Sequence, residues 1–166
     1  FIILLFVGIS CSIPKNQSQL KFSNSFTQEL SDQAQDGRLL LMLSNNDKAE
    51  PRFQISDGLQ TQLVFGIDVE GMKPGQEITL NNDNTFGFPI RLINDVPKGE
   101  YFVQALINRY ETFNLKTGHT VKLPPDQGEG QHWDSKPGNF YSTPTKISVD
   151  PSSDKDIKIS MDKKIA

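Results

Sequence analysis

The sequence contains a single cysteine, Cys11, among 166 residues. One thiol cannot form a disulfide within the chain, and metal sites built from several thiolates are excluded for the same reason. Basic charge is also scarce, because 17 lysine and arginine residues face 20 acidic residues and the formal net charge is -3. A chain without a basic field binds nucleic acid poorly, so we expect no nucleic-acid partner.

The apolar run at the start, Phe1 to Ile9, is too short to cross a bilayer, which takes roughly 20 residues of helix. Its length, and the small residues Gly8 and Ser10 near its end, suit the hydrophobic part of a secretory signal peptide that is truncated at its start. The sequence Gly8-Ile9-Ser10-Cys11 resembles the bacterial lipobox, in which the cysteine is lipidated and becomes the mature N-terminus. Gly8 departs from the leucine usual at the first position. The alternative for Cys11 is a buried free thiol in an N-terminal strand.

The segment after Cys11, Ser12 to Gln19, is polar, carries Pro14 and shows no hydrophobic period. This composition suits a tether between a membrane and a folded domain. We therefore expect residues 1–10 to be a signal peptide and residues 11–19 a lipidated tether. A lipid on Cys11 anchors the protein at a membrane, so the expected location is the bacterial periplasm or cell surface.

The rest of the chain lacks convincing amphipathic helices and contains short apolar segments instead. Leu20, Phe22 and Phe26 indicate a half-buried strand, and the run from Arg38 to Ser44 indicates a strand buried on both faces. Lys116-Thr117-Gly118 lies between two short apolar segments and predicts a hairpin. We predict that residues 20–161 form one all-β domain, an immunoglobulin-like antiparallel β-sandwich of about seven to nine strands.

The segment from Asp95 to Phe113 is the most informative part of this domain. Tyr101 to Ile107 has apolar residues on both faces of the predicted strand, which places this strand inside the sheet. Pro97-x-Gly99-x-Tyr101 resembles the corner of immunoglobulin-like sandwiches, where a tyrosine anchors the strand start through its hydroxyl. Tyr101 is either this structural corner residue or a tyrosine that merely packs.

Catalytic motifs are absent from the sequence. There is no Gly-x-Ser-x-Gly elbow, no His-Glu-x-x-His and no glycine-rich phosphate loop. His119 and His132 have no neighbouring nucleophile that the sequence identifies. We therefore expect no catalytic residue in this chain.

A long loop, Leu123 to Ser142, contains the single tryptophan, Trp133, with Phe140 and Tyr141 nearby. Rigid aromatic side chains on a loop suit stacking on sugar rings or anchoring a protein interface. We predict that this loop binds a ligand or a partner through four residues: Trp133, Phe140, Tyr141 and His132. The alternative is that Trp133 folds back as a plug over the end of the sandwich.

Three acidic residues of the same loop, Asp126, Glu129 and Asp134, could supply oxygen atoms to a calcium ion. Their spacing does not match the Asp-x-Asn-x-Asn-Gly pattern of a calcium loop. We predict neither a metal site nor another cofactor.

Four segments carry a resemblance to a known group of proteins: DGRLLLMLS, AEPRFQI, GEYFVQALINRYETF and TVKLPPDQGEGQHWDSKPGNFYS. Together they resemble the N-terminal β domain that precedes the α/β-hydrolase-type catalytic region of large, exported bacterial esterases. The similarity spans Leu20 to Met161. It implies an accessory domain whose catalytic partner, with the serine nucleophile, lies beyond Ala166. No segment here matches the hydrolase motif itself, so the resemblance assigns no catalytic residue.

Two functions therefore compete. In the first, the chain is a non-catalytic accessory domain that packs on or shapes a downstream hydrolase domain, with residues 162–166 beginning the linker. In the second, it is an independent surface-displayed module that binds a glycan or a protein. A serine hydrolase motif in the coding sequence after Ala166 favours the first function, and a stop codon favours the second.

Overall fold

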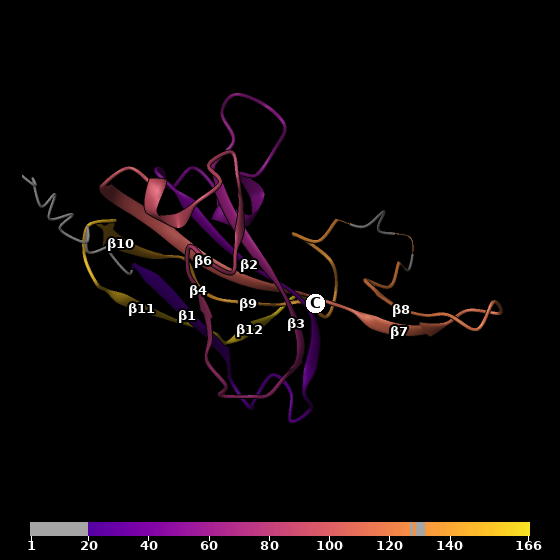
Figure 1. Ribbon diagram of the computed structural model, residues 1–166. Coiled ribbons are helices and arrows are strands. Elements are labelled where there is room, and N and C mark those ends of the chain that lie inside the picture. The colour runs from indigo at the N-terminus through magenta and orange to yellow at the C-terminus, as the bar shows by residue number, and fades with distance from the viewer. Residues whose placement is uncertain (1–19, 127, 129–131) are drawn as a thin grey trace, which may run out of the picture.

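The computed structural model describes residues 20–126, 128 and 132–166. The predicted signal peptide, the tether and Cys11 lie outside these residues. The described part is built almost entirely from strands and two short 3-10 helices, η1 (Pro51–Phe53) and η2 (Ile93–Asp95). Two sheets pack face to face, which confirms the predicted all-β sandwich (Figure 1).

The larger sheet has seven strands. Their order is β12 (Lys163–Lys164), β9 (Phe140–Tyr141), β6 (Gly99–Arg109), β2 (Gln35–Ser44), β3 (Leu63–Met72) and β5 (Phe86–Phe88), and β10 (Thr145–Val149) also pairs with β6. The strand β6 pairs with β2 along one edge and with β9 and β10 along the other. These pairings are antiparallel, as expected from the sequence.

The smaller sheet has the order β11 (Asp156–Met161), β1 (Lys21–Phe26) and β4 (Ile78–Leu80). Its β1–β11 pair is parallel, with Phe22 opposite Ile157, whereas the β1–β4 pair is antiparallel. The strand β1, the first of the domain, therefore lies beside β11, which comes from its C-terminal part.

The two central strands of the large sheet are buried on both faces. In β2 the residues from Leu39 to Ser44 are all buried, and in β6 the residues from Val103 to Ile107 are buried. Leu41 lies between Phe65 of β3 and Ala105 of β6 in the register of the sheet. This is the pattern that a strand inside a sheet requires, and it explains the unbroken apolar run in the sequence.

The main core fills the space between the two sheets. Phe22 and Phe26 of β1 pack there with Leu39, Phe65 and Val103 of the large sheet. Apolar burial of this kind stabilises a domain by roughly 25 cal/mol per Å² removed from water. The domain thus has an ordinary hydrophobic core and needs no disulfide.

The hydroxyl of Tyr101 donates a hydrogen bond of 2.9 Å to the carbonyl oxygen of Pro97. The ring itself is 8% exposed and belongs to the main core. Tyr101 therefore links the segment before β6 to the strand start, which is the contact expected of a structural corner residue.

The large sheet extends past Met161, where the sequence analysis placed the end of the domain. Lys163 and Lys164 form β12 opposite Tyr141 and Phe140. The Ile165 amide donates to the carbonyl oxygen of Asn139, and the Ile165 side chain packs on the outer face of the large sheet. A two-residue strand is too short to show a hydrophobic period, so sequence patterns do not predict β12.

The structure contains twelve strands within the described residues, more than the expected seven to nine. The additional strands β5, β9 and β12 have two or three residues each. None of the described residues form a helix long and apolar enough to cross a membrane.

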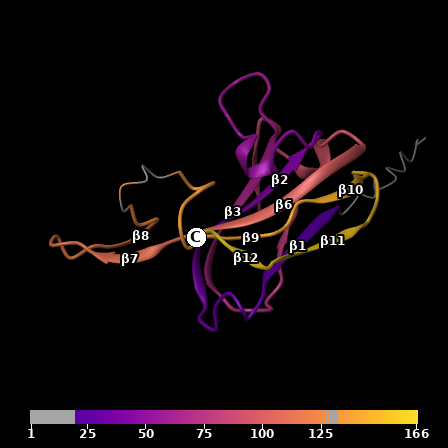
Figure 2. The same cartoon turned by 180° about the vertical axis from the view of Figure 1, so that it is seen from behind.

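The predicted hairpin is present as β7 (Glu111–Asn114) and β8 (Thr120–Leu123), which form a separate two-stranded sheet. Gly118 turns the chain with a φ of 85°, a left-handed value that favours glycine. The hairpin projects from one end of the sandwich, away from both sheets (Figures 1 and 2). The C-terminal end of the chain lies at the root of this projection, beside the start of β7.

Candidate functional site

Three neighbouring features distinguish the end of the sandwich where the hairpin leaves it. They are the hairpin itself, a polar hollow at its root and an aromatic pocket on the outer face of the large sheet.

The hairpin has one apolar face. In its register Phe113 lies opposite Val121, and Glu111 lies opposite Leu123. Side chains alternate along a strand, so Phe113, Val121 and Leu123 share a face with Glu111. Leu115 and His119 continue this face, because the Leu115 amide donates to the His119 carbonyl oxygen. Phe113, Leu115 and Leu123 are 38%, 46% and 53% exposed. The apolar face is thus left largely in solvent.

The root of the hairpin is held by charge. Lys122 Nζ lies 2.9 Å from an Asp36 carboxylate oxygen and 3.4 Å from a Glu70 oxygen. The hydrogen bond from Lys122 is the main cause that lowers the pKa of Asp36, and a hydrogen bond from the Gly71 amide adds to it. The root is therefore fixed to the ends of β2 and β3, whereas the ten residues from 111 to 120 are exposed.

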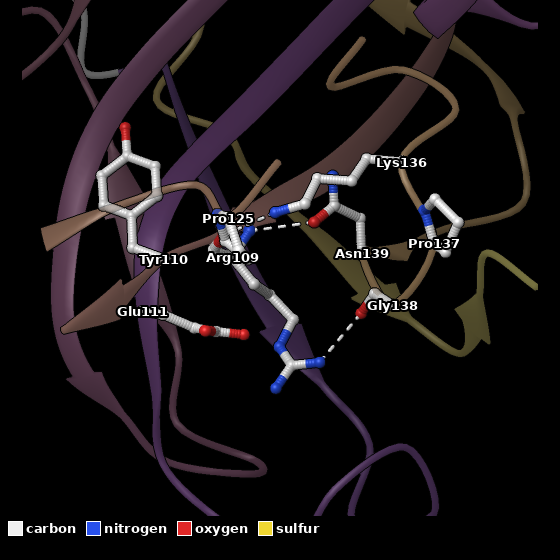
Figure 3. A pocket seen from close by; sticks show the side chains of 8 residues that line it. All are labelled: Arg109, Tyr110, Glu111, Pro125, Lys136, Pro137, Gly138 and Asn139. Atoms are coloured by element: carbon white, nitrogen blue, oxygen red, sulfur yellow. Dashed lines mark hydrogen bonds between the residues drawn. The ribbon is translucent and has the colours of Figure 1, made fainter. Parts of the chain in front are cut away.

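The polar hollow lies beside this root and has a volume of about 510 Å³. Figure 3 shows the residues that line it: Arg109, Tyr110, Glu111, Pro125, Lys136, Pro137, Gly138 and Asn139. The Arg109 guanidinium donates to the Gly138 carbonyl oxygen at 3.1 Å and to the side-chain oxygen of Gln35. It also lies 5.0 Å from the centre of the Phe140 ring.

Both cations of the hollow are tied to the backbone. Lys136 is only 5% exposed, and its Nζ donates to the Arg109 carbonyl oxygen at 3.3 Å. Burial lowers the pKa of Arg109, and the nearby Glu111 carboxylate opposes this shift. Among the described residues, the lining includes no serine, cysteine or histidine, and its charged groups are Arg109, Glu111 and Lys136.

The aromatic pocket lies on the face of the large sheet that points away from the small sheet. Its volume is about 260 Å³. Trp133, Phe86 and Phe88 provide aromatic surfaces, and Leu40 and Val64 belong to its apolar part. Phe86 and Phe88 are 54% and 47% exposed although both lie on β5, which pairs with β3.

Arg52 of η1 fastens the loop that carries Trp133. Its guanidinium lies 4.3 Å from the centre of the Phe53 ring and 4.2 Å from that of Tyr141. The same group donates to the Asp134 carbonyl oxygen at 2.8 Å and to Glu50 at 2.9 Å. Because Arg52 is 8% exposed, these contacts are largely shielded from water.

The four residues predicted to form a binding site do not all lie on one surface of the domain. Trp133 is half-buried and packs on the outer cluster of Leu40, Met42 and Leu106. Tyr141 packs on the same cluster and against Arg52, and His132 is exposed beside Trp133.

Phe140 is fully buried in the main core, with its ring 5.4 Å from that of Phe26. It therefore belongs to the core and not to the expected interface. The reason is the alternation along β9, which turns Phe140 inward where Tyr141 turns outward.

The sequence analysis missed Phe86, Phe88, Arg38 and Asn108, which also line the aromatic pocket. The segment Phe86-Gly87-Phe88 could have indicated an aromatic surface, because residues two positions apart share a face of a strand. Nothing local links them to Trp133, which lies far along the chain.

The described residues contain no cluster of three or more histidine, cysteine, aspartate or glutamate side chains that could hold a metal ion. Glu129, one of the acidic residues considered for calcium, lies outside them. Comparison of the chain with protein-family models, with curated proteins and with solved structures gave no significant match.

Proposed function

We propose that this chain is a non-catalytic accessory domain that packs against the catalytic region of an exported bacterial hydrolase of the esterase type. One structural observation carries the docking role, namely the exposed apolar face of the β7–β8 hairpin. The resemblance of four segments to the β domain of exported esterases supplies the identity of the partner. The apolar run before Cys11 supports export and a lipid anchor.

The hairpin supports docking because its conformation is costly without a partner. A two-stranded hairpin alone in water is marginally stable at best. This one is held at its root by the contact between Lys122 and Asp36, yet it exposes Phe113, Leu115 and Leu123 on one face. Large exposed apolar groups that share a face are typical of a surface that another domain covers.

The position of the hairpin favours a partner on the same polypeptide. The amide of Gly138, in the polar hollow, donates to the carbonyl oxygen of Ile165 at 2.9 Å, and Arg109 donates to Gly138. Ile165 therefore lies next to the root of β7. A region joined to Ala166 would begin beside the apolar face and could dock without a long connection, which raises its effective concentration at that face.

The first experiment is to read the coding sequence beyond Ala166. A Gly-x-Ser-x-Gly elbow within an α/β-hydrolase pattern is the expected result, and an immediate stop codon would remove the proposal. The second is to express the two halves separately and measure their association. Leu115→Ser should weaken binding at least about fivefold, because a truncated apolar contact at an interface typically costs about 1 kcal/mol or more.

The matched control is Leu59→Ser. Leu59 is an equally large apolar side chain, it is 102% exposed, and it lies outside the hairpin. Its substitution should leave the association unchanged. Equal affinities for Leu115→Ser and the unmodified domain would show that the hairpin is not the docking surface. The isolated domain should not hydrolyse simple acyl esters.

A further inference from the structure

We propose that the aromatic pocket on the outer face of the large sheet binds one ring of a neutral oligosaccharide. The inference does not depend on docking to a hydrolase, because the pocket and the apolar face of the hairpin share none of their residues. It assigns a ligand class to a cavity lined by the strands β2, β3, β5 and β6, by the loop before β9, by Ile55 after η1 and by Tyr110 between β6 and β7.

The pocket is kept open by a glycine. A methyl group added to Gly66 would lie 3.2 Å from Leu40 Cδ2 and 3.4 Å from the Phe86 ring. Gly66 pairs with Phe86 in the sheet and lines the pocket. A larger side chain at this position would therefore occupy space beside the Phe86 ring that a ligand could otherwise use.

The aromatic surfaces suit a sugar ring. The face of an aromatic ring carries the negative part of its quadrupole, and the C–H groups on the flat side of a pyranose are weakly positive, so the two pack together favourably. Phe86 and Phe88 present exposed rings to the same cavity as the half-buried Trp133. With Tyr110, four aromatic side chains therefore line a space of about 260 Å³.

Polar groups flank the aromatic surfaces. Arg38 forms two hydrogen bonds with the Asp68 carboxylate, of 2.8 and 3.2 Å, and its guanidinium carbon lies 5.3 Å from the centre of the Phe86 ring. The side-chain oxygen of Asn108 accepts a hydrogen bond from Asn139. Among the described residues, the Asn108 side-chain nitrogen and the Trp133 indole nitrogen have no hydrogen-bond partner. Both groups can therefore donate to a ligand.

A pocket with aromatic surfaces and polar groups at its edge matches a sugar better than an apolar side chain of a peptide. A pyranose has an apolar flat side and a rim of hydroxyl groups that both donate and accept, whereas an aliphatic side chain would offer no acceptor to the Asn108 side-chain nitrogen. Asp68 balances the charge of Arg38, so the rim favours a neutral sugar over an acidic one. The volume is smaller than that of pockets for drug-sized ligands, roughly 300 to 1,000 Å³, and suits a single ring.

The single tryptophan provides a direct test, because Trp133 is the sole indole of the chain and lines the pocket. The full chain is titrated with cellohexaose, xylohexaose, maltohexaose and mannohexaose while the tryptophan emission is recorded. At least one of these probes should change the emission in a saturable manner. No saturable change with any of them up to about 10 mM, roughly the weakest affinity expected of a specific site, would overturn the proposal.

Two variants locate the binding. Gly66→Val should weaken it at least about tenfold by filling the pocket, with Tm and near-ultraviolet circular dichroism showing that the fold is retained. Phe88→Ala should weaken it by a similar factor without adding bulk. Leu59→Ala, an exposed apolar residue away from the pocket, is the control and should bind normally. If Phe88→Ala binds as tightly as the unmodified chain, the sugar lies elsewhere and the assignment is wrong.

A final comparison separates the ligand classes. Trigalacturonate, which carries carboxylates, should bind more weakly than the best neutral probe. Tighter binding of trigalacturonate would contradict the neutral assignment. Saturable binding of a proline-rich peptide in the absence of any sugar response would identify the pocket as a peptide site and overturn the proposal. Loss of hydrolase association in Leu115→Ser with normal sugar binding would separate the two functions.

Discussion

The side-chain amide of Asn139 donates a hydrogen bond of 2.9 Å to the backbone carbonyl oxygen of Trp133. The same amide reaches the Asn108 side-chain oxygen at 3.2 Å, and the Asn139 side-chain oxygen accepts from the Arg109 amide at 3.0 Å. Asn139 is fully buried, so one side chain joins the tryptophan loop to β6 out of contact with water. This residue couples the aromatic pocket to the polar hollow.

We therefore predict that Asn139→Ala lowers the free energy of unfolding by about 1 to 3 kcal/mol, because it leaves buried partners without hydrogen bonds. Urea denaturation measures this change. The Trp133 emission should also shift to longer wavelength as the loop separates from the sheet. Asn45→Ala, at an exposed position, is the control and should change neither quantity. Identical urea midpoints for both variants would contradict the role of Asn139.

The second prediction concerns the central strand β6. Val103 is 1% exposed in the main core, and Val103→Asp should cost about 3 kcal/mol or more because it buries an unpaired charge. Thermal unfolding measures the loss. Thr145→Asp is a matched control, since Thr145 pairs with Val103 in the sheet but is exposed. An unchanged Tm for Val103→Asp would show that β6 is not where the structure places it.

The third prediction concerns pH. The Lys98 ammonium, 2.7 Å from the Asp150 carboxylate, lowers the pKa of Asp150 from 3.8 to about 2, and hydrogen bonds from Ser152 add to the shift. Because the folded pKa is depressed, the contribution of this pair to stability is present above the unfolded pKa and is lost as the pH falls from about 4 toward 2.

Carbon NMR of the Asp150 carboxyl group checks this value. Lys98→Met removes the main cause, so the pKa of Asp150 should rise toward its ordinary value while the Ser152 hydrogen bonds retain part of the shift. Lys48→Met, at an exposed lysine in another loop, should leave the titration of Asp150 unchanged. A carboxyl group that already titrates near pH 4 in the unmodified protein would rule out the Lys98 pair.

The fourth prediction concerns Cys11 and follows from the sequence. If the lipobox-like segment is used, protein expressed in bacteria with a complete signal peptide should partition into detergent. Cys11→Ser should release it into the aqueous phase or leave it unprocessed. Stable retention requires more than one acyl chain, because a single chain binds a membrane only marginally. The same partitioning for both proteins would exclude a lipid on Cys11.

The strands themselves were determined by local sequence. The runs around Leu41 and Val103 predict strands buried on both faces, and the Lys116-Thr117-Gly118 loop predicts the hairpin, because side-chain alternation and turn chemistry act over a few residues. The same local patterns predicted the all-β class, and they made the Tyr101 hydroxyl contact one of two alternatives. They also misplaced Phe140, since a two-residue strand carries too little alternation to tell inward from outward.

The arrangement of the surface was decided by the tertiary structure. Trp133, Phe86 and Arg38 lie in three distant parts of the sequence, and only the pairing of β5 with β3 and the hydrogen bonds of Asn139 and Arg52 bring them to one pocket. The apolar face of the hairpin is likewise visible as alternation in the sequence, but its exposure is not. Alternation shows which side chains share a face, whereas what covers that face depends on long-range packing.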